Sequence, residues 1–278
     1  MNLFLPIIFL AIVQAIAEFL PISSSGHLLI MQRLDLFGTS LADYNEETSL
    51  FLNVALHIAT LAAIIIYLRK DIWEILSGGC RELVSKNFAG TNLLTLRNII
   101  LATIPAGAAG VFAGDFFTSI YSNLMLVFLF LIINGFVLIT TKIIPLNTRK
   151  IEEMGIIRSI AVGLFQAAAI LPGISRSGMT ITGGFIAGLT PNDAARFSFL
   201  MAVPVIGGAG LLEARKLFIG SIPHELLPPL CIAMVIAAVI ALAAMKLLFE
   251  LVRKVRIDVF GYYTILVGTA GIVWLTLQ

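Results

Sequence analysis

Two similar polar stretches, 14–27 and 166–180, hold the residues of this sequence that could do chemistry. A shift of 152 positions (166 − 14) superimposes Gln14 on Gln166, Ser23 on Ser175, Ser25 on Ser177 and Gly26 on Gly178. The chemically important differences set Glu18, Ser24 and His27 of the first copy against Ile170, Arg176 and Met179 of the second. One copy therefore offers a candidate nucleophile and base, and the other offers a fixed cation. That combination suits a phosphate group.

The first copy places an ionisable side chain one helical turn from an amide. Gln14 and Glu18 are four residues apart, so on a helix they share one face. Inside a membrane segment an ionisable residue costs about 2.5–3.5 kcal/mol on insertion scales and is a functional candidate by default. The alternatives are that Glu18 lies at the membrane interface or forms a structural pair with Arg176.

Pro21 predicts the end of the first helix, and a cluster of small polar residues follows it. The cluster is Ser23, Ser24, Ser25, Gly26 and His27. A helix beginning here would point free backbone N–H groups and the positive end of its dipole at the break, which suits an anion. One serine could be a nucleophile if Glu18 or His27 took its proton. Serines at helix starts are also common N-caps, but a second copy of the cluster favours a functional role.

The second copy has an arginine between two serines at the corresponding break, in the sequence Pro-Gly-Ile-Ser-Arg-Ser-Gly-Met-Thr at 172–180. Glycine lets the backbone approach a ligand closely. The guanidinium of Arg176 can bind phosphate oxygens bidentately and stays charged when buried. The alternative is an arginine whose side chain reaches the membrane surface, but a tip at the membrane midplane has no interface nearby.

The elements that must position these residues are membrane helices. The chain is 59% hydrophobic and 12% charged, with a mean hydropathy of +1.02, which excludes a soluble domain. The segments that are apolar enough to span a bilayer are 51–68, 98–118, 123–141, 195–214, 227–249 and 259–277. The basic residues lie in short loops, so the net charge of +2 predicts no nucleic-acid partner.

The charges of the loops orient these segments. Lys and Arg concentrate in 69–97, 142–158 and 250–258, which predicts that these loops are cytoplasmic. The acidic loop 32–50 is expected outside. The loop 215–226 is also expected outside, because successive spans alternate the side on which the loops lie.

With this orientation, residues 1–31 begin and end outside, and residues 159–190 begin and end inside. The two segments therefore enter the membrane from opposite faces. We therefore expect an all-α integral membrane protein with six transmembrane helices and two re-entrant helical hairpins in an inverted-topology repeat. The single membrane domain, 1–278, would contain repeats at about 1–141 and 159–278, joined by the cytoplasmic linker 142–158. The alternative is that residues 3–20 cross the bilayer completely.

Several motifs together resemble the undecaprenyl-diphosphate phosphatase family, also called bacitracin-resistance proteins. They are [Glu/Gln]xxxGlu, Pro-x-Ser-Ser-x-Gly-His and Pro-Gly-x-Ser-Arg-Ser-Gly-x-Thr, with Ala-Thr-Ile-Pro at 102–105 and Phe-Ser-Phe-Leu-Met-Ala-Val-Pro at 197–204. The resemblance implies a plasma-membrane enzyme that removes the terminal phosphate of a polyprenyl diphosphate and recycles the lipid carrier of cell-wall synthesis. It also implies a site open to the extracytoplasmic side and catalytic roles for Glu18, Ser24, His27, Ser175, Arg176 and Thr180. Many relatives carry glutamate where this chain has Gln14.

The mechanism that we expect has Ser24 attack the terminal phosphorus, with Glu18 or His27 handling its proton and Arg176 clamping the phosphate. The substrate-binding residues would be Gln14, Ser23, Ser25, Gly26, Ser175, Ser177, Gly178 and Thr180. In the alternative mechanism His27 is the nucleophile or the leaving-group acid, and Ser24 is a hydrogen-bond donor.

Some properties stay open at this point. A divalent cation, Mg²⁺ or Ca²⁺, would be bound largely through substrate phosphates, because the sequence has no ligand cluster beyond Glu18. A homodimer is open, as is the prenyl chain length. The alternative function is transport of an anionic lipid, since broken helices that meet at the midplane are also a transporter architecture.

Overall fold

The computed structural model describes residues 4–33, 46–112, 120–121, 123–145, 147–217 and 226–277, without the side chains of 46–50 and 213–217. Apart from one β-bridge between Arg149 and Leu189, the described residues form helices and their connections. The helices are α1 (Phe4–Phe19), α2 (Ser24–Arg33), α3 (Glu46–Tyr67), α4 (Arg69–Val84), α5 (Thr91–Phe112), α7 (Leu124–Thr140), η2 (Ile151–Glu153), α8 (Gly155–Ala168), α9 (Arg176–Ile186), α10 (Pro191–Leu217), α11 (Leu227–Arg253) and α12 (Asp258–Thr276).

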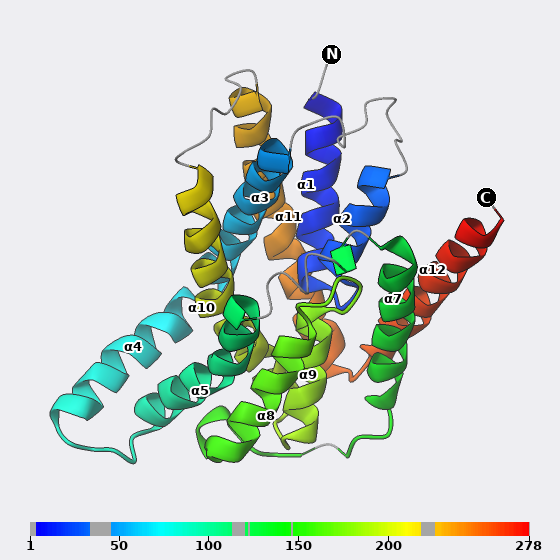
Figure 1. Ribbon diagram of the computed structural model, residues 1–278. Helices are drawn as coiled ribbons and strands as arrows, with labels where there is room; N and C mark the ends of the chain where they lie inside the picture. The colour runs from blue at the N-terminus through cyan, green and yellow to red at the C-terminus, as the bar shows by residue number, and fades with distance from the viewer. Residues whose placement is uncertain are drawn as a thin grey trace.

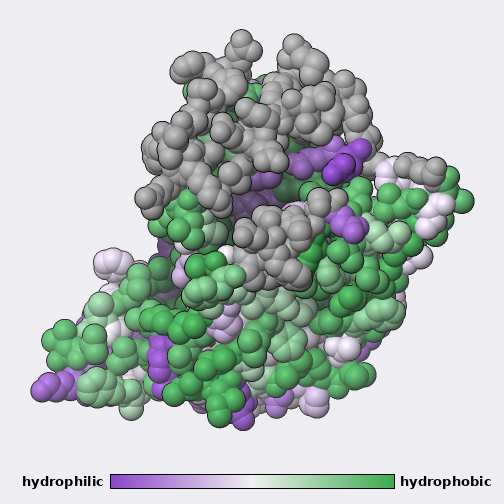
Figure 2. Space-filling view, viewed as in Figure 1, coloured by the Kyte–Doolittle hydropathy of each residue, from purple (hydrophilic) through white to green (hydrophobic). Residues whose placement is uncertain are grey.

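The helices confirm an all-α membrane protein. In the described part of the chain, α5, α11, α12 and the 191–212 part of α10 are long and apolar enough to cross a bilayer. The pair of α3 and α4, bent by 72° at a short break, makes a fifth candidate span, whereas α1, α7 and α8 are apolar but shorter. Figure 2 shows that the described surface is largely hydrophobic, with hydrophilic residues gathered in a recess of its upper half and along its lower edge.

Both polar stretches form a helix, a break and a second helix, as the sequence predicts. α1 ends at Phe19 and α2 begins at Ser24, with Pro21 in the break. α8 ends at Ala168, and Ser175 is the N-cap of α9. α1 and α2 lie in the upper half of the molecule, α8 and α9 lie in the lower half, and the two breaks meet between them (Figure 1).

Helix packing follows a paired pattern. α1 packs on α11 while α8 packs on α5, and α3 with α10 and α7 with α12 form further close pairs. Small residues permit the closest approaches. A Cβ on Gly135 would lie 2.5 Å from the carbonyl oxygen of Gly261, and a Cβ on Gly261 would lie 2.6 Å from that of Gly135. Only glycine at these two positions lets the backbones of α7 and α12 touch.

Two boundaries differ from those expected. The predicted loop 69–97 contains α4, because Arg69–Val84 is an amphipathic helix whose polar residues had suggested a connection. The described part of the predicted span 98–118 belongs to α5, which begins earlier, at Thr91. The expected external loops, 32–50 and 215–226, lie largely outside the described residues.

Candidate active site

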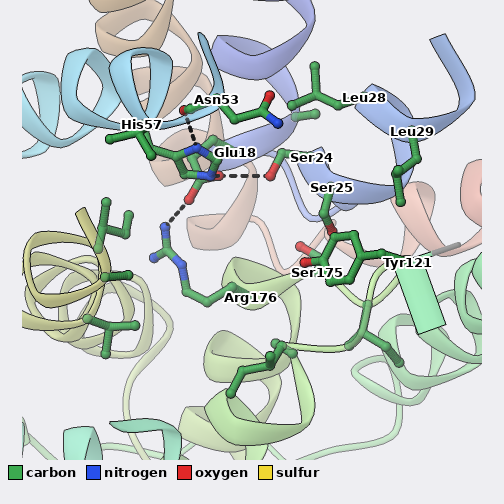
Figure 3. Close-up of a pocket in the computed structure, with 18 of the residues that line it drawn as sticks. Glu18, Ser24, Ser25, Leu28, Leu29, Asn53, His57, Tyr121, Ser175 and Arg176 are labelled. Atoms are coloured by element: carbon green, nitrogen blue, oxygen red, sulfur yellow. Dashed lines mark hydrogen bonds and ion pairs between the residues drawn. The ribbon is translucent and has the colours of Figure 1, made fainter. Parts of the chain in front are cut away.

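A cavity of about 430 Å³ lies where the two hairpins meet α3 and α10. Its wall carries a polar group of side chains: Glu18, Ser24, Ser25, His57, Ser175 and Arg176 (Figure 3). The rest of the wall is mostly apolar, with Leu28 and Leu29 from α2 and Val205 and Ile206 from α10. A cavity with one polar region and apolar walls is suited to an amphipathic ligand.

The carboxylate of Glu18 is the centre of the polar region. Its Oε1 accepts a hydrogen bond from Nη2 of Arg176 at 2.7 Å, and its Oε2 accepts one from Oγ of Ser24 at 2.8 Å. The Nε2 of Gln14 also donates to Oε2, at 3.2 Å. Glu18 is 7% exposed and Arg176 is 14% exposed, so each charge is held against the other inside the protein. A hydroxyl bonded to a carboxylate in this way can transfer its proton to it.

The two breaks are in direct contact. Ser23 Oγ accepts hydrogen bonds from the backbone N–H of Gly26 in its own hairpin and of Gly173 in the other, at 3.3 and 3.1 Å. A Cβ on Gly26 would lie 3.1 Å from Cα of Gly173, and one on Gly178 would lie 3.1 Å from Cβ of Pro21. The glycines predicted to bind substrate thus also let the tips approach each other.

Each break contains one described residue in the left-handed region of backbone conformation. In the first hairpin it is Ser23, with φ +71°, and in the second it is Gly173, with φ +100°. A non-glycine residue at such a φ is uncommon and tends to occur at functional sites.

Asn134 of α7 joins the two breaks. Its Oδ1 accepts a hydrogen bond from the backbone N–H of Ser175 at 2.9 Å, and its Nδ2 donates to the carbonyl oxygen of Pro21 at 3.2 Å. The side chain is fully buried. One amide therefore satisfies a backbone group from each hairpin and fixes the distance between Ser24 and Arg176.

The predicted catalytic residue His27 does not line this cavity. Its ring stacks on Tyr263 of α12, with centroids 5.6 Å apart, and its Nε2 hydrogen-bonds the Tyr263 hydroxyl at 2.9 Å. Its Nδ1 donates to the carbonyl oxygen of Ser23 at 2.9 Å. Both ring nitrogens are therefore occupied on the side of α2 that faces α12.

The other predicted binding residues divide into two groups. Ser25 and Ser175 reach the cavity wall. The remaining ones lie behind it and hold the tips in place: Gln14, Ser23, Gly26, Ser177, Gly178 and Thr180. Ser175 Oγ accepts the N–H of Gly178 at 3.2 Å and contacts Ser177 Oγ at 3.1 Å, as an N-cap does. Thr180 Oγ1 hydrogen-bonds Ser198 Oγ of α10 at 2.6 Å.

Sequence reasoning missed or undervalued some residues of the site. Asn53 and His57, one turn apart on α3, line the cavity, and a spacing of four residues on a membrane helix is equally typical of helix–helix contact. Asn134 was missed, and its signal was an amide inside the apolar run of α7. Tyr121 lies beside Ser25 on the wall (Figure 3).

The donor set suits only a weakly ligated metal ion. Within the described residues, no group of three His, Cys, Asp or Glu side chains is placed to hold one. Glu18 is the carboxylate on the cavity wall, and the buried Oε1 of Gln14 has no hydrogen-bond partner among the described residues. Because Gln14 lies behind the wall and both oxygens of Glu18 are hydrogen-bonded to neighbouring side chains, a hard cation would be held by phosphate oxygens rather than by these residues.

Comparison with known proteins places this arrangement in a family. The family described as "Bacitracin resistance protein BacA" matches residues 7–270. The undecaprenyl-diphosphatase of Rubrobacter xylanophilus is 32% identical over 257 residues, covering 92% of each chain. Those of Alkaliphilus metalliredigens and Methanococcus maripaludis are 34% and 35% identical, covering 96% and 92% of this chain and 97% and 94% of their own. The protein therefore belongs to the BacA family of bacitracin resistance proteins.

Proposed function

We propose that the protein hydrolyses a polyprenyl diphosphate to the monophosphate and inorganic phosphate, which recycles the lipid carrier of cell-wall synthesis and contributes to bacitracin resistance. The name of its relatives, undecaprenyl-diphosphatase, supports the reaction and the substrate class. The observation that carries the proposal is the Glu18 carboxylate. Its two oxygens contact the Ser24 hydroxyl at 2.8 Å and the Arg176 guanidinium at 2.7 Å. Nucleophile, base and cation thus share the wall of one cavity.

Ser24 is the nucleophile in this proposal. Its Oγ attacks the terminal phosphorus, its proton passes to Oε2 of Glu18, and the bond from that phosphorus to the bridging oxygen breaks. The bridging oxygen leaves with the electron pair as part of the prenyl monophosphate. Water then attacks the phosphoserine, Ser24 Oγ regains a proton, and inorganic phosphate is released.

Arg176 and the two helix starts stabilise the negative charge. Protonation of Glu18 removes the counter-charge of Arg176 and frees its guanidinium for phosphate oxygens. α2 and α9 both begin at the cavity, so their N-termini favour an anion there. Phosphate-ester hydrolysis is among the slowest uncatalysed reactions, which explains why several groups must share this work. A bound Mg²⁺ or Ca²⁺, held largely by the phosphate oxygens of the substrate, would neutralise further phosphate charge.

The alternative mechanism makes His27 the nucleophile or the leaving-group acid. The hydrogen bond from Ser24 to Glu18 favours Ser24 as the nucleophile. The ring nitrogens of His27 are already hydrogen-bonded to Tyr263 and the Ser23 carbonyl, which argues against the alternative. Trapping and mapping a phosphoenzyme separates the two mechanisms. Phosphate on histidine rather than serine would remove the Ser24 mechanism.

We infer that the finer architecture consists of six spans and two re-entrant hairpins, with inverted repeats at about 1–141 and 159–278 and the linker 142–158 between them. The packing pattern supports this, because exchanging the halves converts the α1–α11 contact into the α8–α5 contact. The basic loops favour a multi-pass protein of the cell membrane. We propose that its site opens to the extracytoplasmic side. A homodimer is compatible with this arrangement.

The test is phosphate release from a polyprenyl diphosphate by the purified protein. We expect Glu18→Gln to reduce kcat by about 10²–10⁴-fold, the usual contribution of a positioned base. Ser24→Ala should abolish the phosphoenzyme, and Arg176→Ala should reduce the rate by about 10²–10³-fold, as the loss of an oxyanion donor does.

Matched controls lie on α4, away from the cavity: Ser77→Ala and Glu74→Gln should leave the rate unchanged. If the wild type releases no phosphate with any divalent metal, yet binds the lipid through Arg176, the phosphatase proposal is refuted and transport of an anionic lipid becomes the favoured function.

A further inference from the structure

His57 of α3 lines the cavity and takes no part in the steps proposed for Ser24, Glu18 and Arg176. Its Nε2 lies 3.7 Å from Oε2 of Glu18, the same oxygen that accepts the hydrogen bond of Ser24. In Figure 3 the Glu18 carboxylate lies between His57 and Ser24. One carboxylate oxygen thus contacts a hydroxyl on one side and faces an imidazole on the other.

The orientation of the ring is set by its own helix. Nδ1 of His57 lies 2.8 Å from the backbone carbonyl oxygen of Asn53. A carbonyl can only accept, so Nδ1 carries the hydrogen, and in the neutral ring Nε2, 3.7 Å from Oε2 of Glu18, is the nitrogen without one. A neutral imidazole in this position can take up a proton from a protonated Glu18.

Glu18 must pass on the proton that it accepts, because it has two functions. It must accept the proton of Ser24 in the first step, and it must be charged again to pair with Arg176 in the resting state. Its side chain is only 7% exposed, whereas that of His57 is 37% exposed and lines the cavity. Among the described residues, the side chains that contact or face Oε2 belong to Ser24, Gln14 and His57, and of these only the imidazole offers a basic nitrogen.

Resting on the proposed phosphatase function, we propose that His57 is the proton-relay residue of Glu18. As Ser24 Oγ bonds to phosphorus and the bridging P–O bond breaks, the Ser24 proton passes to Oε2 and then to Nε2 of His57. The imidazolium gives this proton to the departing prenyl phosphate or to water. In the second step the attacking water loses a proton along the same route to His57, and Ser24 Oγ regains one as the phosphoserine bond breaks. The cycle consumes one water and restores every side chain.

The test uses the full-length protein in detergent and compares His57→Ala, His57→Gln and the control Ile66→Ala, which lies on an exposed part of α3 away from the cavity. We expect both His57 variants to lose about 10²–10⁴-fold in kcat, the range for a positioned acid–base group, with KM changed less than about threefold. Added imidazole should restore part of the rate of His57→Ala, because the vacated space can hold a diffusible base. A purely structural role would not respond to imidazole.

Three outcomes would overturn the relay. One is a His57→Gln enzyme with nearly the wild-type kcat, since glutamine can hydrogen-bond to Glu18 but cannot carry a proton. Another is a change confined to KM, which would make His57 a substrate-binding residue. The third is an inactive, correctly folded His57→Ala that imidazole does not rescue. Failure of the wild type to release phosphate would instead reject the phosphatase function itself, so the two proposals fail separately.

Discussion

Replacement of Asn134 by leucine should separate the two hairpin tips. The side chain is fully buried and forms one hydrogen bond to each break, through the Ser175 N–H and the Pro21 carbonyl. Leucine has a similar size but bonds to neither group. A buried backbone group without a partner costs about 1–3 kcal/mol, so two such groups cost about 2–6 kcal/mol. At about 2–4 °C per kcal/mol, the melting temperature in detergent should fall by roughly 5–20 °C.

The matched control is Asn98→Leu. Asn98 is another fully buried asparagine, and its Nδ2 donates to the carbonyl oxygen of Ile151 at 2.7 Å, away from the cavity. Both variants should lose stability, but only Asn134→Leu should also lose phosphate release per folded molecule, because only its amide sets the distance between Ser24 and Arg176. A melting temperature within about 2 °C of the wild type, or full specific activity in Asn134→Leu, would refute the bridging role.

Three further changes test the tips and the helix ends. Gly173→Ala should abolish folded protein, because a Cβ there would meet a backbone carbonyl oxygen and the residue has a φ of +100°. The control Gly107→Ala should fold normally, because no atom lies within 4 Å of the added Cβ. Equal yields of the two folded proteins would contradict this. Ser23→Ala should destabilise the fold by about 1–3 kcal/mol in chemical denaturation, since it leaves the Gly173 N–H without its acceptor. The hydrogen bond to Asp258, 3.0 Å away, raises the pKa of Lys142 above its ordinary value of 10.5, so this stabilising contribution is present below pH 10.5 and is lost as the pH rises through the raised pKa. Melting curves should therefore show an alkaline loss of stability that is smaller in Lys142→Met, and identical curves for the two proteins would count against it.

The local features of the site could be predicted from sequence because proline, serine and glycine act over a few residues. Pro21 ends α1 within two residues, and Ser175 caps α9 with its own hydroxyl. The similarity of the two copies placed the breaks together, and with them Glu18 and Arg176. These predictions needed no knowledge of distant packing.

The features that depend on distant packing could not be predicted. α2 turns Ser24, Ser25, Leu28, Leu29 and Gln32 towards the cavity. At 3.6 residues per turn, His27 lies about 130° around the helix from the middle of that stripe, and it meets Tyr263, 236 positions away. The sequence does not reveal which side of a ten-residue helix faces α12. The role of Asn134 was hidden for the same reason, since both of its partners are backbone groups of other elements.

The contact between Glu18 and Arg176 also bears on the ancestry of the fold. Two identical copies of the first stretch would put a second serine at the position of Arg176 and a second glutamate at that of Ile170, so the site would hold two carboxylates and no guanidinium. Two copies of the second would oppose two arginines, with no hydroxyl beside a base. An ancestor that paired two equal halves therefore could not have used this chemistry. The chemistry requires two unequal halves in one chain, one with the acid and the other with the cation, and each depends on the other.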